Sequence, residues 1–146
     1  MDLLERKKFT KNIGGHDLII ETSDLAKQAN AAVTATYGDT TVMATVVMED
    51  SDSDRDYLPL SVDFEEKFYS VGRILGSRFM RREGRPSEEA VLSGRVIDRT
   101  IRPLFDHRIR RPIQVVATIL SYDGENDPDF VALMAASTAP RTVSGK

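Results

Sequence analysis

The distribution of apolar residues in the first third of the chain predicts β-structure. Two pairs of segments have strand composition: Phe9–Ile13 with Asp17–Thr22, and Ala31–Tyr37 with Thr41–Met48. Gly14-Gly15 joins the first pair and Gly38-Asp39 joins the second, and short glycine-containing links of this kind predict β-hairpins. The second pair is rich in Val and Thr, which suit a pleated surface.

The middle of the chain changes from strand to loop to helix. Apolar and polar residues alternate in part over Tyr57–Tyr69, which predicts a strand with one buried face. Phe68 is one of the apolar residues expected on that face. Asp24–Ala29 fits a helical turn or a loop equally well. Val71–Pro86 has three glycines and no alternation, and it predicts a long loop; loops longer than about 12–15 residues inside compact domains are usually functional.

A helix is predicted after this loop. Ser87 is a good N-cap, and two glutamates follow it at the positive end of the helix dipole. Pro103 should end the helix near Arg102. The expected buried stripe has spacings of three or four residues and consists of Ala90, Gly94, Ile97, Ile101 and Leu104.

The last part of the chain predicts one strand and one helix. Ile113–Leu120 is almost continuously apolar, so we expect a central strand that is buried on both faces. Asp127-Pro128 fits an N-cap followed by a proline at the first helical position, and predicts a helix through Ala139. The chain of 146 residues is therefore expected to form one α/β domain.

Charge is distributed unevenly along the chain. Residues 71–111 carry 11 arginines, no lysine and a net charge of +6, whereas the remainder carries −9. Arg85 and four further arginines lie on the predicted loop, and Arg95, Arg99 and Arg102 lie on one face of the predicted helix. Guanidinium groups bind phosphate in a bidentate manner and stack on bases, so this segment indicates a polyanion partner. The alternative is a solvated surface whose arginines pair with nearby acids such as Asp98.

Catalytic groups are not evident in the sequence. The chain has no cysteine, which excludes a thiol nucleophile and fits a reducing cytoplasm, and no apolar run is long enough to span a membrane. His16 and His107 are interpreted as surface residues. The acidic segment from Asp123 to Asp129 could offer oxygen ligands, but a turn at Asp123-Gly124 and an N-cap at Asp127 are the favoured interpretation. We therefore assign no catalytic and no metal-binding residue.

Four segments, in order, resemble the first RNase PH-like domain of the polynucleotide phosphorylases. They are residues 25–30 with 37–40, residues 72–74 with 79–88 (Phe-Met-Arg-Arg-Glu-Gly-Arg-Pro-Ser-Glu), residues 98–105 and residues 123–129. The resemblance implies an RNase PH-like βαβ sandwich of the α/β (α+β) class over residues 1–139. Residues 140–146 form a divergent tail, and the domain is expected to be incomplete at its C-terminus.

The resemblance also implies a function. Such enzymes degrade single-stranded RNA from the 3′ end by phosphorolysis, as homotrimers, with Mg²⁺ and inorganic phosphate. Both would bind outside this chain, because no residue here matches the family's catalytic carboxylates. A cytoplasmic location and a place in an RNA-degradation complex are implied as well.

The RNA-contact residues implied by the resemblance are Phe79, Arg81, Arg82 and Arg85, with Arg95, Arg99 and Arg102 as additional RNA or subunit contacts. The isolated chain is expected to be inactive. Two alternatives remain: a non-enzymatic RNA-binding module, and a free-standing phosphorolytic nuclease of RNase PH type.

Overall fold

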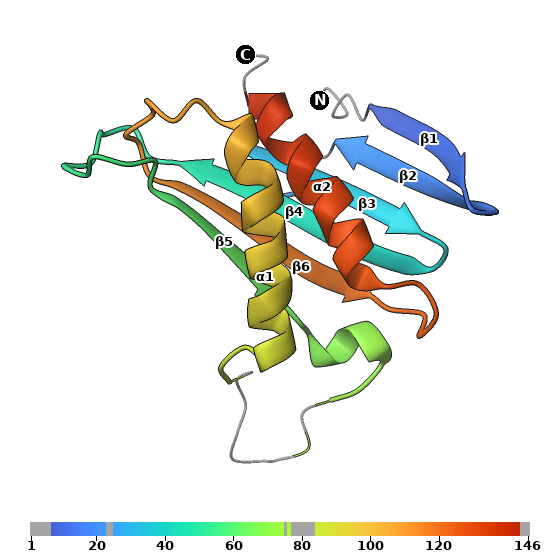
Figure 1. Ribbon diagram of the computed structural model, residues 1–146. Coiled ribbons are helices and arrows are strands. Elements are labelled where there is room, and N and C mark those ends of the chain that lie inside the picture. The colour runs from blue at the N-terminus through green and yellow to red at the C-terminus, as the bar shows by residue number, and fades with distance from the viewer. Residues whose placement is uncertain (1–6, 23–24, 75, 77–83, 144–146) are drawn as a thin grey trace.

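A six-stranded mixed sheet, covered on one face by two helices, forms the protein (Figure 1). The computed structural model describes residues 7–22, 25–74, 76 and 84–143. The strands lie in the order β1-β2-β3-β4-β6-β5, and all neighbours are antiparallel except β5 and β6. The elements are β1 (Lys8–Ile13), β2 (His16–Thr22), β3 (Ala31–Tyr37), β4 (Thr40–Met48), β5 (Leu60–Glu65), η1 (Phe68–Val71), α1 (Glu88–Ile101), η2 (Arg102–Leu104), β6 (Ile113–Ser121) and α2 (Pro128–Val143).

Both predicted hairpins are confirmed. β1 pairs with β2 around Gly14 and Gly15, and β3 pairs with β4 around Gly38. All three glycines have positive φ, the region that such tight links between strands require. Residues 25–30 form turns and bends rather than a helical turn.

The two helices begin as their capping residues predict. Ser87 Oγ accepts the Ala90 N–H at 3.0 Å, and Asp127 Oδ1 accepts the Asp129 N–H at 2.9 Å. α1 ends at Ile101, directly before the turn that contains Pro103. α2 continues past the predicted end to Val143, with Pro140 inside the helix. Its preceding alanines are fully buried against the sheet, and this packing offsets the backbone hydrogen bond that proline cannot donate.

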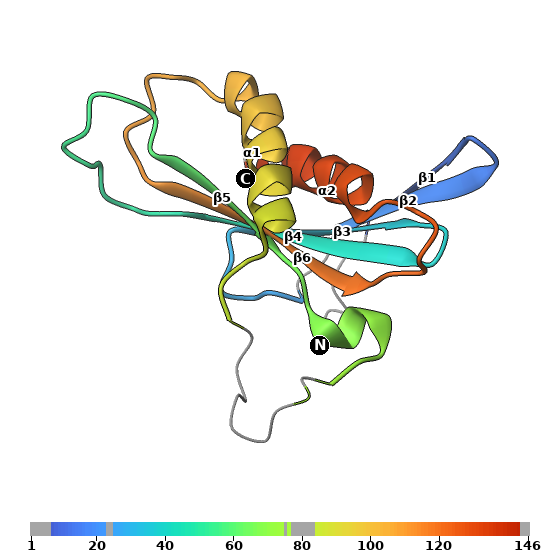
Figure 2. The ribbon, with the colours of Figure 1, turned by 60° about the horizontal axis from the view of Figure 1, so that its bottom comes forward.

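The prediction that β6 is buried on both faces is wrong. β6 is an internal strand, but only the side chains at Ile113, Val115, Ala117 and Ile119 are buried. Both helices lie on the same face of the sheet (Figures 1 and 2), so neither of them covers the opposite face, which we call the open face. That open face is half-exposed and rich in threonine: Thr34, Thr36, Thr41, Thr45 and Thr118.

Two further burial predictions are also wrong. The strand predicted over Tyr57–Tyr69 ends at Glu65, and Phe68 lies in η1 with 45% of its surface exposed. Leu104, expected in the buried stripe of α1, is 57% exposed. The chain leaves the α-helix after Ile101 and forms a 3₁₀ turn over Arg102–Leu104, so the helical spacing that should bury Leu104 no longer applies.

The connection from β5 through α1 to β6 is left-handed. In Figure 1 the helices lie in front of the sheet, β5 and β6 both run from upper left to lower right, and β5 lies on the outer, lower-left side of β6. Most connections of this type are right-handed. A general topological rule would therefore have placed β6 on the wrong side of β5.

A hydrogen-bonded latch joins the β3–β4 turn to the segment before α2. The Asp123 carboxylate accepts the backbone N–H groups of Glu125 and Asn126, both at 2.8 Å, and that of Asp39 at 3.2 Å. It also accepts the Asn126 side-chain amide at 2.6 Å. These donors hold the pKa of Asp123 far below its ordinary range. Thr40 Oγ1 completes the latch by donating to the Asn126 carbonyl at 3.0 Å.

The two faces of β6 should respond oppositely to a charge. Val115→Lys places an ammonium in the fully buried core, where an unpaired charge costs several kcal/mol against a total stability of about 5–15. Val116→Lys places the same group on the open face beside Asp63 of β5. We expect Val115→Lys to be insoluble or unfolded, and Val116→Lys to melt cooperatively. Equal loss of folding in both variants would contradict a one-sided core.

The latch can be tested at Gly38, whose matched control is Gly72. Both have positive φ, so alanine costs about 1–2 kcal/mol of backbone strain at either position. A Cβ at Gly72 meets open space, whereas at Gly38 it collides with the Asn126 side-chain amide. Urea denaturation should therefore show a larger loss of stability for Gly38→Ala than for Gly72→Ala. Equal losses of unfolding free energy in the two variants would mean that the latch does not contribute to stability.

Candidate nucleic-acid interface

The loop that carries most of the predicted RNA contacts is anchored at both ends. η1 and its C-cap residue Gly72 form the start of the loop, and Ser87 and α1 follow it. Phe79, Arg81 and Arg82 lie outside the described residues, so their contacts remain predictions. Arg85 is described and exposed.

The N-terminal anchor is tied to the end of β6. The Tyr122 N–H donates to the Ser70 carbonyl at 2.9 Å, and the Gly72 and Arg73 N–H groups close η1 by donating to Tyr69 and Phe68. The C-terminal anchor is tied to the end of β5, because Ser87 Oγ donates to Glu66 Oε2 at 2.8 Å. The loop therefore leaves and rejoins the fold at the end of the sheet where β5 and β6 terminate (Figure 2).

Arg102 is engaged within the fold. Its guanidinium donates to both Asp98 carboxylate oxygens, at 2.8 and 3.3 Å, and to the carbonyls of Leu58 and Leu60, at 3.4 and 3.1 Å. It thereby joins the end of α1 to the start of β5. The sequence offered the alternative that these arginines pair with nearby acids such as Asp98. Arg102 forms that pair.

Arg95 and Arg99 differ from Arg102. Both are exposed, and in the described part of the chain no carboxylate forms an ion pair with either. The sequence placed all three arginines on one helix face. The structure leaves two of them facing solvent on α1, where they are available to a polyanion.

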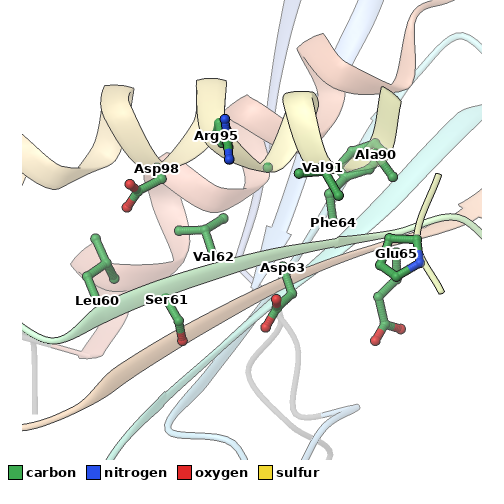
Figure 3. Close-up of a pocket in the computed structure, with 12 residues that line it drawn as sticks. Leu60, Ser61, Val62, Asp63, Phe64, Glu65, Ala90, Val91, Arg95 and Asp98 are labelled. Atoms are coloured by element: carbon green, nitrogen blue, oxygen red, sulfur yellow. The ribbon is translucent and has the colours of Figure 1, made fainter. Parts of the chain in front are cut away.

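Arg95 also lies beside a groove of about 430 Å³ between β5 and α1 (Figure 3). β5 alternates here: Figure 3 shows Leu60, Val62 and Phe64 on the side facing α1, and Ser61, Asp63 and Glu65 on the opposite side. The groove is therefore floored by apolar side chains, with Arg95 and Asp98 as the charged groups that α1 contributes. This arrangement offers an anchoring charge but no pair of nucleophile and base.

Three further arginines of the basic segment, Arg108, Arg110 and Arg111, lie beyond the C-terminal end of α1 and are hydrogen-bonded or ion-paired there. Arg108 donates to both carboxylate oxygens of Asp106 and lowers the pKa of that carboxyl to about 2. Arg111 forms an ion pair with Asp52, which lies between β4 and β5, at 3.6 Å, and Arg110 donates to the His107 carbonyl. The excess of positive charge in the sequence is thus partly neutralised by neighbours in space.

The acidic segment before α2 has structural roles. Asp123 forms the latch and Asp127 caps α2. Asp129 accepts the Ser93 hydroxyl at 2.7 Å, and partial desolvation raises the pKa of its carboxyl. Among the described residues, no three acidic or histidine side chains converge on a point where a metal ion could bind. In the same part of the chain, no helix is long and apolar enough to cross a membrane.

Sequence comparison identifies close relatives. The chain is 51% identical to the polyribonucleotide nucleotidyltransferase of Desulforamulus reducens over 88% of its length, and 52% identical to that of Acidiphilium cryptum over 95%. The corresponding enzyme of Bradyrhizobium is 55% identical over 90%. The chain spans only 17–20% of the length of these three relatives.

Solved structures show the same fold. Rice Rrp46 matches 98% of the chain with a TM-score of 0.60 at 13% identity, and the chain covers 56% of it. A subunit of an archaeal exosome core matches 90% with a TM-score of 0.57 at 19% identity, and the chain covers 48% of it. The family model for the 3′ exoribonuclease family, domain 1, matches residues 14–142. With its RNase PH-like fold and this match across nearly its whole length, the chain belongs to the 3′ exoribonuclease family.

Proposed function

We propose that this chain acts as the N-terminal part of a polyribonucleotide nucleotidyltransferase, and that it supplies RNA-binding and assembly surfaces. The observation that carries the proposal is the identity of about 50% to such enzymes across about 90% of the chain. The activity is 3′ to 5′ phosphorolysis of single-stranded RNA, in which phosphate attacks the terminal phosphodiester and a nucleoside diphosphate leaves.

The charges of the described residues suit RNA binding and do not suit Mg²⁺ binding. Attack of one anion on another requires positioning and cationic neutralisation. The described residues offer exposed guanidiniums at Arg85, Arg95 and Arg99. They do not fit a Mg²⁺ site, because the Asp123 oxygens already accept N–H donors, Asp129 accepts the Ser93 hydroxyl, and no three acidic or histidine side chains of the described chain converge. Mg²⁺ and phosphate would therefore bind to parts of the enzyme outside this chain.

RNA would contact the loop first. Arg81, Arg82 and Arg85 neutralise phosphates and Phe79 stacks on a base. Arg95 and Arg99 extend this surface along α1, toward RNA or a neighbouring subunit. Arg102 is the least suited of the predicted contacts, since its donors are used within the fold. A homotrimeric ring, a cytoplasmic location and membership of an RNA-degradation complex complete the proposal.

Activity assays separate the proposal from its alternatives. With labelled single-stranded RNA, phosphate and Mg²⁺, the chain alone should release no nucleoside diphosphate. Nucleoside diphosphate should be released when the chain is mixed with a related enzyme that lacks the region matching this chain. Release by the chain alone would indicate a free-standing nuclease. RNA binding without complementation would indicate a non-enzymatic module.

The salt dependence of RNA binding tests the loop. Each lost phosphate contact should flatten the plot of log K against log salt concentration by about 0.7, so Arg81→Ala with Arg82→Ala should remove roughly 1–1.4 units of slope. Phe79→Ala should weaken binding by about 1–3 kcal/mol with little change in slope, because stacking releases no ions. The measurement is fluorescence anisotropy with a labelled oligonucleotide.

The matched control is Arg108→Ala with Arg111→Ala, which removes two arginines that are paired with Asp106 and Asp52 at the other end of α1. Its slope should equal that of the unmodified chain. An unchanged slope in the Arg81/Arg82 double variant would show that the loop does not contact phosphate. A flattened slope in the control would show that non-specific charge dominates.

A further inference from the structure

An open groove of about 580 Å³ lies at the foot of the loop, between η1, the end of β6 and the approach to α1. We call it the η1 groove. Its walls include Phe68, Val71, Ile119 and Tyr122, and the positively charged side chains on its rim are Lys67 and Arg85. All six belong to the described part of the chain, and both ends of the loop border the groove.

The backbone around the groove is held in place. The Tyr122 N–H donates to the Ser70 carbonyl at 2.9 Å and so fixes η1 against the end of β6. On the opposite rim, Ser87 joins Glu66 to the start of α1. Sites on such supported elements keep their geometry better than sites on free loops.

The groove exposes aromatic surface. Phe68 is 45% exposed and Tyr122 is 38% exposed, although both are next to an apolar floor formed by Phe64 and Ile119. Exposed aromatic rings in a hollow are the common platform for unpaired bases, because every base has a stacking face. Burial of this surface by a base would remove it from water.

Charges on the rim orient such a ligand. Lys67 forms an ion pair with Glu65 at 2.9 Å, and Glu66 accepts the Ser87 hydroxyl. The two glutamates disfavour a phosphate inside the groove. Arg85 has no carboxylate partner within the described residues, so it favours a phosphate at its own side of the rim.

We propose that the η1 groove binds one unpaired nucleobase of RNA, with Tyr122 and Phe68 as its apolar walls and the adjoining phosphate at Arg85. This inference rests on the proposed RNA-binding function and adds a base subsite to it. Tyr122, which lies outside the basic segment, becomes an RNA contact. RNA would then run from the loop onto the edge of the folded domain.

The test compares two exposed tyrosines at opposite ends of the sheet. Tyr122 follows β6, and Tyr57, which is 59% exposed, precedes β5. Tyr122→Leu should weaken binding of a labelled single-stranded oligoribonucleotide by about 5- to 150-fold, the loss expected for one stacked base, without changing the salt slope. Tyr122→Phe should retain most of the affinity because the ring remains. Tyr57→Leu should bind as the unmodified chain does.

Cross-linking provides a measurement that needs no variant. Oligoribonucleotide containing 5-iodouridine, irradiated with the unmodified chain, should cross-link to the peptide that contains Tyr122 or Phe68. Cross-links elsewhere only, or unchanged affinity of a folded Tyr122→Leu variant, would overturn the subsite and leave RNA binding intact. No RNA binding by the unmodified chain would overturn the proposed function together with the subsite.

Discussion

Parallel pairing of β5 with β6 is the constraint on which the arrangement of the molecule depends. Two parallel strands need a connection that returns the chain to the end where the first strand began. Here the return is made by α1, so the described residues between the end of β5 and the start of α1 lie at one end of the sheet. η1, Ser87 and the described ends of the arginine-bearing loop lie there for that reason, and the end of β6 brings Tyr122 to the same place.

Much of this architecture follows from local pattern. The hairpins at Gly14 and Gly38, the cap at Ser87 and the end of α1 before Pro103 each depend on a few neighbouring residues, and all were predictable. The exposure of Val116, Phe68 and Leu104 could not be predicted from the sequence. It depends on which face of the sheet the helices cover and on where a strand or helix ends. An apolar run such as that of β6 is compatible with one buried face or two, and only the packing of α1 and α2 distinguishes them.

Charge illustrates the same limit at the candidate interface. Counting along the chain assigns Arg102, Arg108 and Arg111 to one basic segment with Arg85 and Arg95. In space the first three are held by Asp98, Asp106 and Asp52, of which the last is remote in sequence. Linear charge therefore overstates the number of arginines that remain for a polyanion.

The latch has a consequence for how members of this family are identified. Two of the four segments that reveal kinship, around Gly38 and around Asp123, meet each other in space and hold a turn to the start of a helix. The residues of these two segments are needed for the hydrogen bonds that hold the β3–β4 turn to the start of α2. A descendant of this domain could lose every arginine that faces solvent and still be recognised by these segments, so recognisable ancestry and retained RNA binding are separate properties.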